Sequence, residues 1–197
     1  MAQDFGLGNL ITPKHFVRFY DDDNALVKEI TQFIGTGLAA GHGGIVIATP
    51  AHVTEIERRL LASGCEIATA KETGQYVALD AAATLSRFMV NGWPDDQRFH
   101  EVVGGLIRQA EHLHSWVRAF GEMVALLWAE QKQDAALHLE KLWNDLANSY
   151  YSFSLFCAYP IKDFDDDMSR HRFKDVCTEH SRILMPDRVV DQRSPAI

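Results

Sequence analysis

The stretch Gly44-Ile45-Val46-Ile47-Ala48-Thr49-Pro50 gives the clearest indication of the fold. Its run from 44 to 48 contains no polar position, which is typical of a strand covered on both faces in a parallel sheet. Thr49 and Pro50 then begin a helix, because proline is favoured in the first helical turn, where its missing N–H costs nothing. A buried strand followed directly by a helix predicts an α/β fold.

The same alternation continues on both sides of this stretch. Apolar and β-branched runs predict further strands at 15–20, 76–79, 115–120 and 152–159. Helical periodicity predicts helices at 26–38, 50–62, 81–90, 102–113, 121–128, 134–150 and 165–181. The connections are long enough for right-handed helical crossovers. We therefore expect three layers, with a mainly parallel sheet between helices. Residues 1–13 are expected to be a loose leader, 14–184 a single domain and 185–197 a flexible tail.

Composition excludes several classes of function. The chain has 197 residues, with 19 Lys and Arg against 27 Asp and Glu, for a formal charge of −8. Such an acidic chain is a poor candidate for direct nucleic-acid binding, which needs clustered cations on phosphates. Weakly charged stretches such as 35–51 do not resemble a membrane span, because they are short, rich in glycine and interrupted by His42.

Cysteine usage indicates a reducing compartment. The three cysteines, Cys65, Cys157 and Cys177, have no CxxC spacing, and the start of the chain lacks a secretory signal pattern. We expect a cytoplasmic protein. Each cysteine is either a small buried apolar residue, the commoner case, or a reactive thiol.

Two common catalytic classes lack their motifs. A phosphate-binding loop needs GxxxxGK[ST] between a strand and a helix, but the turn after the first strand is YDDDNALVKE, whose carboxylates would repel a triphosphate. ATPase activity is therefore not expected. No GxSxG elbow or HExxH spacing occurs either, and the nine histidines are scattered, which predicts surface or capping roles for most of them.

Candidate ligand-binding residues follow from the rule that parallel α/β sheets bind ligands at the carboxyl ends of their strands. The rule selects 20–24, 49–52, Asp80, 118–122 and 157–160. Glu122 could anchor a helix start, pair with Arg118 or hold a ligand or ion. On the 134–150 helix, Glu140 and Asn144 share a face beside the apolar stripe; a hydrogen-bond anchor to a loop is the commoner explanation for such a pair.

Several segments together resemble a known family. HFVRFY (15–20), FIGTGLAAGHGGIVIAT (33–49), VRAFGEMVALLW (117–128), LEKLWN (139–144) and LFCAYP (155–160) are similar to the MEDS domain, the methanogen/methylotroph sensory domain found with a dichloromethane-responsive repressor. The resemblance covers about residues 14–181. It implies a RecA/KaiC-like fold that has lost its phosphate loop. It also implies sensing, in a family often joined to kinase, anti-sigma or DNA-binding modules.

The favoured hypothesis is a non-catalytic sensor. It would bind a small, perhaps apolar, ligand in an aromatic-lined crevice at the strand ends and signal through a separate kinase, anti-sigma factor or transcription regulator. Its candidate ligand-binding residues are His15, Tyr20, Arg118, Glu122, Trp143, Asn144, Cys157 and Tyr159. No cofactor is expected, and a homodimer is the expected assembly.

Two alternatives remain open. One is a metal-dependent or small-molecule enzyme that uses Glu122 with a histidine such as His15 or His180, the three weak candidates for metal ligands. The other is a protein-interaction module built on a degenerate ATPase fold.

Overall fold

A computed structural model describes residues 15–149, 152–164, 167–186 and 189–191. Its centre is a seven-stranded sheet in the order β3-β2-β6-β7-β1-β8-β9, in which every neighbouring pair is parallel except β8 and β9. The strands are β1 (His15–Tyr20), β2 (Gly43–Ala48), β3 (Tyr76–Asp80), β6 (Val117–Gly121), β7 (Phe153–Pro160), β8 (Arg182–Leu184) and β9 (Val189–Asp191).

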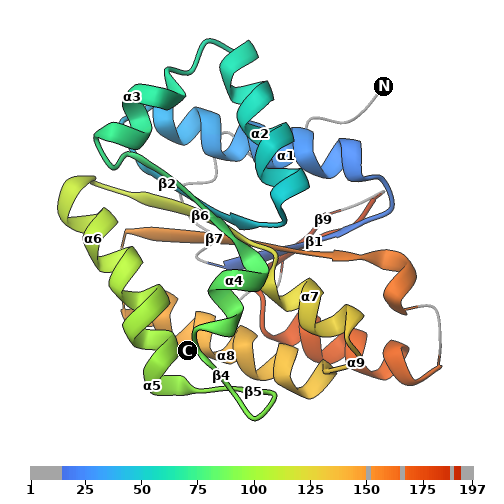
Figure 1. The fold of residues 1–197 in the computed structure, drawn as a ribbon. Coiled ribbons are helices and arrows are strands. Elements are labelled where there is room, and N and C mark those ends of the chain that lie inside the picture. Colours follow the sequence, from blue (N-terminus) through green and yellow to red (C-terminus); the bar gives the residue numbers. More distant parts are fainter. Residues whose placement is uncertain (1–14, 150–151, 165–166, 187–188, 192–197) are drawn as a thin grey trace.

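Helices cover both faces of this sheet (Figure 1). One face carries α1 (Asp23–Ala39), α2 (Pro50–Ala62) and α3 (Ile67–Glu72). The other carries α4 (Ala81–Ser86), α5 (Asp96–Phe99), α6 (Gly105–Leu113), α7 (Met123–Ala129), α8 (Gln133–Ser149) and α9 (Asp167–Thr178). A π-helical segment, His100–Gly104, joins α5 to α6, and a 3-10 turn, Ile161–Phe164, follows β7. The expected three-layer α/β architecture is confirmed.

The apolar run of β2 supplies both hydrophobic cores. Ile45 and Ile47 belong to the core under α4–α8, whereas Val46 and Ala48 belong to the core under α1–α3. Successive side chains of a strand point to opposite faces, so an uninterrupted apolar run is what a doubly covered strand requires. The prediction made from this stretch is confirmed.

Two aspartates begin helices as expected. The Asp22 carboxylate accepts hydrogen bonds from the backbone N–H groups of Asn24 and Ala25, both at 3.1 Å, at the start of α1. Asp80 accepts one from Ala83 N–H at 2.6 Å at the start of α4. Such caps satisfy N–H groups that have no partner within their own helix.

The structure differs from the sequence prediction after α4. The helix ends at Ser86, and Met89–Val90 (β4) pairs with Trp93–Pro94 (β5) in a small hairpin. Asn91 and Gly92 form its turn with φ of 50° and 82°. An Asn-Gly turn with both residues in the left-handed region is the favoured connection for a two-residue hairpin, so the local turn preference stops the helix.

Part of the expected tail belongs to the sheet. Residues 189–191 form β9, antiparallel to β8, in a segment expected to be a flexible tail. The leader 1–13 and the expected start of the last helix at Asp165 lie outside the described residues. Within the described residues, every helix is too short or too polar to span a bilayer.

Candidate functional site

Four parallel strands end around one cavity. Tyr20 closes β1, Thr49 follows β2, Glu122 follows β6 and Pro160 closes β7, and all four residues line a pocket of about 630 Å³. The remaining lining residues come from the start of α1, the start of α2 and the 3-10 turn: Asp21, Asp22, Asp23, His52, Ile161 and Lys162. The pocket therefore lies where an open parallel sheet is expected to bind ligands.

The side chain of Glu122 connects two elements at this pocket. Its Oε2 accepts a hydrogen bond from Thr49 N–H, and its Oε1 accepts one from His52 Nδ1, both at 2.8 Å. Its backbone N–H also donates to Ile47 O at 2.9 Å. The side chain is only 8% exposed, so these hydrogen bonds compensate the cost of burying its charge. Glu122 thereby ties the end of β6 to the first turn of α2.

The neighbours of Glu122 respond to its charge. The hydrogen bond to Glu122 raises the pKa of His52, with burial acting in the opposite direction. Burial, and then the charge of Glu122, raises the pKa of the Tyr20 phenol. The pocket lining therefore contains an imidazole that is protonated more readily than usual and a phenol that ionises less readily than usual.

The lining is more polar than the sequence suggested. We expected a crevice lined by aromatic side chains. Of the ten lining residues, Tyr20 contributes a phenol ring and His52 an imidazole, and the other eight have no ring system of this kind. The carboxylates of Asp21, Asp22, Asp23 and Glu122 face this space with a single lysine, Lys162. A strand end followed by helix-capping residues is necessarily rich in short polar side chains, which explains the difference.

Arg118 lies away from this pocket. It is the second residue of β6, only 4% exposed, and its Nη1 donates to Phe33 O and to Thr36 Oγ1, both at 2.9 Å. Its side chain points to α1 because alternate residues of a strand face opposite sides. Of the alternatives considered for Glu122, the pairing with Arg118 does not occur, because Arg118 is hydrogen-bonded to α1.

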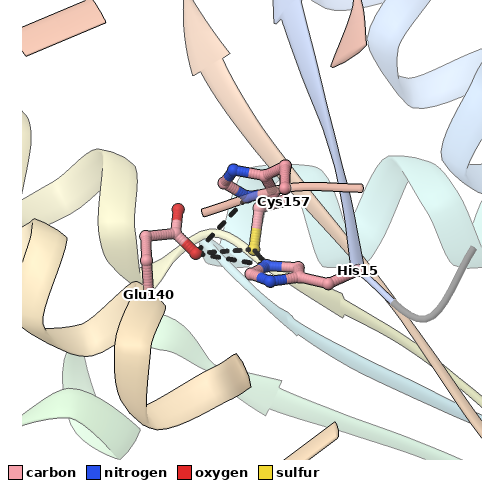
Figure 2. A group of neighbouring side chains, drawn as sticks. His15, Glu140 and Cys157 are labelled. Carbon is pink, nitrogen blue, oxygen red and sulfur yellow. Dashed lines mark hydrogen bonds and ion pairs between the residues drawn. The ribbon is translucent and has the colours of Figure 1, made fainter. Parts of the chain in front are cut away.

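A second group of polar side chains is buried between the sheet and α8 (Figure 2). Glu140 Oε2 lies 3.2 Å from His15 Nε2, 3.5 Å from His180 Nε2 and 3.6 Å from Cys157 Sγ. His15 Nε2 also lies 3.3 Å from Cys157 Sγ. All four residues are at most 2% exposed. They come from β1, α8, β7 and the segment between α9 and β8, and we call them the His–Glu–Cys cluster.

Further hydrogen bonds orient the cluster from outside. Tyr159 donates its hydroxyl proton to Glu140 Oε1 at 2.7 Å. Asn144 Oδ1 accepts from His15 Nδ1 at 2.8 Å, while its Nδ2 donates to Glu179 O and Oε2 at 2.8 and 2.9 Å. His180 Nδ1 donates to Val176 O at 2.7 Å. Both imidazoles consequently present Nε2 to Glu140.

Burial perturbs the titration of this group strongly. It lowers the pKa of His15, with help from His180, and raises the pKa of the Cys157 thiol and the Tyr159 phenol, with help from Glu140. Burial alone would raise the pKa of Glu140, but the two histidines outweigh it and hold that pKa below its usual range. The carboxylate is the charged member of a largely neutral group.

The eight predicted site residues thus separate into three places. Tyr20 and Glu122 line the pocket. His15, Asn144, Cys157 and Tyr159 belong to or contact the cluster. Arg118 supports α1, and Trp143 is a core residue, 1% exposed, packed edge-on against Phe99. No single crevice collects all eight.

The expected pairing of acid and histidine is also corrected. His15 and His180 lie beside Glu140, whereas the histidine beside Glu122 is His52. Neither buried histidine has the surface or capping role predicted for most of the nine, because each lies under a helix of the second layer. The sequence does point to His52, because it follows a predicted strand. It also points to Glu140 together with Asn144, because the two share one face of a predicted helix. No local signal connects Glu140 to histidines at opposite ends of the described chain.

Comparison with known proteins agrees with this architecture. Among solved structures, a protein from Pyrococcus horikoshii OT3, described as a structural study, superposes with a TM-score of 0.55 at 9% identity, over 92% of this chain and 86% of that one. At this identity the similarity shows the fold alone. No curated protein matches the sequence. Residues 14–174 match the family described as the methanogen/methylotroph, DcmR sensory domain, which is more than half of the chain, and the protein therefore belongs to the MEDS sensory domain family.

Proposed function

We propose that this protein is a non-catalytic sensor that binds a small organic molecule in the strand-end pocket and signals through a separate protein. The observation that carries the proposal is the 630 Å³ cavity, in which Tyr20, Thr49, His52 and Glu122 converge from different elements. A concave site with a few converging polar groups is the usual form of a small-molecule site. Membership of a sensory family supports the same function.

The lining favours a polar ligand over the purely apolar one considered from the sequence. Four carboxylates outnumber the single lysine, so a positive charge or hydrogen-bond donors on the ligand would complement the pocket. Pro160, Ile161 and the ring of Tyr20 leave room for a small apolar portion. We therefore infer a small amine or hydroxylated molecule as the preferred class.

Glu122 provides the route from ligand to signal. Its carboxylate is the link between the end of β6 and the first turn of α2. A ligand that hydrogen-bonds to His52 or Glu122 would compete with this link and would change how α2 is held. The partner protein, a kinase, anti-sigma factor or transcription regulator, would then respond to the position of α2.

An enzymatic role is the second candidate, and the His52–Glu122 pair is the observation that favours it. A histidine whose pKa is raised by a carboxylate can act as a general acid or base. Both oxygens of Glu122 are already occupied by hydrogen bonds, however, which suits a positioning role better than proton transfer.

ATP hydrolysis fits the pocket poorly, in agreement with the sequence. Asp21 and Asp22 lie between β1 and α1 and Asp23 begins α1, in the region where a phosphate loop would need backbone N–H groups and a lysine. We infer a RecA/KaiC-like core without a working phosphate site. The parallel β1, the turn and α1 support that inference, and the strand-end location of the pocket agrees with it.

The test is native mass spectrometry of the purified protein, followed by a thermal-shift screen of small amines, alcohols and ATP with magnesium. A compound that binds or stabilises the wild type should lose its effect in His52→Gln and Asp21→Asn, whereas Lys141→Gln on the exposed side of α8 should leave that effect unchanged. Stabilisation that is unchanged in the two pocket variants would overturn the proposal. Turnover of a compound would favour the enzyme. The same spectra report whether the expected homodimer forms.

A further inference from the structure

The His–Glu–Cys cluster is separate from the proposed ligand pocket. None of His15, Glu140, Cys157 and His180 lines the cavity at the strand ends. One ligand atom from each of these residues lies within 4.8 Å of all the others. Two imidazole nitrogens, a carboxylate oxygen and a sulfur therefore converge on one point in the protein interior.

The spacing is that of a tetrahedral metal site. Zinc binds His, Cys and carboxylate ligands at about 2.0–2.3 Å, which sets neighbouring ligand atoms about 3.3–3.7 Å apart. Four of the six separations between the ligand atoms are 3.2, 3.3, 3.5 and 3.6 Å, and the other two, from His180 to His15 and to Cys157, are within 4.8 Å. An ion could thus be placed at the centre with small side-chain movements.

The outer hydrogen bonds favour a cation at this point. Because Asn144 and Val176 accept the Nδ1 protons of His15 and His180, the Nε2 atoms are left to present lone pairs inward. Those lone pairs face the Glu140 carboxylate, and Nε2 of His180 has no hydrogen-bond partner among the described residues. Lone pairs that face one another repel unless a positive charge, either a proton on one imidazole or a metal ion, lies between them. Metal-binding histidines characteristically donate their second nitrogen to such a carbonyl or amide oxygen.

The charges also balance. A Glu140 carboxylate and a Cys157 thiolate together carry two negative charges, which a divalent ion neutralises, while both imidazoles stay neutral. The thiol proton leaves to solvent when the ion binds. A neutral complex is the form in which these groups are best buried, since all four residues are at most 2% exposed.

We propose that His15, Glu140, Cys157 and His180 bind one zinc ion in a closed structural site. Nitrogen, sulfur and oxygen ligands in tetrahedral arrangement favour zinc over magnesium or calcium, which prefer oxygen alone, and over copper(II), which prefers a tetragonal geometry. Four protein ligands leave no open position, as in structural sites. The ion fastens β1 and β7 to α8 and to the segment before β8.

The test begins with metal analysis of the full chain as purified, where about one zinc per chain is expected. Metal-stripped protein is then titrated with CoCl2, because tetrahedral cobalt bound to a thiolate gives an intense, diagnostic absorption. Wild type should show the absorption and a rise in melting temperature. Cys157→Ser should lose the sulfur-to-cobalt band, while Cys65→Ser, a cysteine outside the cluster, should keep it.

A variant outside the four ligands separates binding from folding. Asn144→Ala removes the acceptor of His15 Nδ1 and leaves the four ligands in place. It should weaken zinc affinity by about 10–100-fold, as is typical of groups that orient metal ligands. A folded wild-type protein that contains no metal and gives no cobalt spectrum would overturn the proposal. So would binding that Cys157→Ser and Asn144→Ala leave unchanged. Neither result would bear on the strand-end pocket.

Discussion

Glu122 illustrates how one carboxylate can hold two elements together. We expect Glu122→Gln to lower the free energy of unfolding by about 1–3 kcal/mol. The amide is uncharged and has one acceptor oxygen, so it cannot accept hydrogen bonds from both Thr49 N–H and His52 as the two carboxylate oxygens do. It should also return the pKa of His52 toward its ordinary value, since the hydrogen bond to Glu122 is the main cause of the rise. NMR titration of the His52 ring checks the second effect, and chemical denaturation checks the first.

The pH dependence of this pair has a definite sign. The pKa of His52 is higher in the folded protein, so the stabilisation from its charged form is complete below the ordinary histidine pKa. It declines as pH rises through the raised value. The stability difference between wild type and Glu122→Gln should therefore shrink on the alkaline side. Asp96→Asn, which removes the carboxylate 2.8 Å from His138, is the matched control and should leave the His52 titration unaltered. A difference that grows with pH would contradict this assignment.

For single residues, the sequence predicted which side chains lie at a site better than it predicted which side chains they contact. Tyr20 and Glu122 were selected because each follows a parallel strand, and both line the pocket. His15 and Cys157 were selected without their connection to Glu140, and His180 was considered only with Glu122. The contact between His15 and Cys157 spans 142 positions, and the contact between His180 and Glu140 depends on the packing of the segment after α9. Periodicity carries no information on such distances.

Helix α1 depends on a close approach between its Gly37 and β6. A Cβ atom added to Gly37 would lie 2.7 Å from Arg118 Cδ and 2.9 Å from its Nε. Arg118 cannot move away freely, because its guanidinium is bonded to Phe33 O and Thr36 Oγ1. We expect Gly37→Ala to destabilise the protein by about 1 kcal/mol, since an overpacking cost of about 1–3 kcal/mol exceeds the helix-propensity gain of about 1 kcal/mol.

A matched substitution distinguishes packing from propensity. In Gly105→Ala, at the start of α6, the added Cβ meets only Arg108 Nη2 at 3.8 Å, an ordinary contact. That variant should be as stable as wild type or up to about 1 kcal/mol more stable. Thermal or urea unfolding of both variants decides the matter. Equal stabilisation by the two alanine substitutions would show that the Arg118 side chain moves away from the added Cβ atom without lowering the stability of the protein.

The elements were predictable where periodicity is long. All five strands expected from the sequence are present, and the long helices α1, α2 and α8 lie within a few residues of their predicted bounds. The short elements α3, β8 and β9 were missed because three to six residues cannot display a period. The β4–β5 hairpin was missed although Asn91-Gly92 is a strong turn signal; helical periodicity from 81 to 90 overrode it.

The whole sheet is expected to open from its edges. Strands β2, β6, β7 and β1 each have a hydrogen-bonded neighbour on both sides, whereas β9 is an edge strand whose Val189 and Val190 are exposed. Amide hydrogen exchange should therefore be slowest in β6 and β7 and fastest in β9. Mass-spectrometric exchange of peptic peptides measures this order. Protection of β9 equal to that of β7 would reveal a partner covering that edge.

Strand order could not be read from the sequence. Alternating elements and crossover length predicted a parallel three-layer fold, which is observed. The position of β1 between β7 and β8, in contrast, depends on pairing between segments far apart in the chain, which local periodicity does not report. The location of the pocket depends on that order, since Tyr20 and Pro160 meet only because β1 and β7 are neighbours.

The position of β1 has a consequence during translation. β1 precedes the other described strands in the chain, yet its two neighbours, β7 and β8, are made from residues 153–160 and 182–184. At elongation rates of about 5–20 residues per second, these partners leave the ribosome on the order of ten seconds after β1. The nascent segment HFVRFY must wait that long without its sheet, with Arg18 as the charge that discourages premature association. The largely apolar hexapeptide must therefore avoid aggregation until most of the chain has been synthesised.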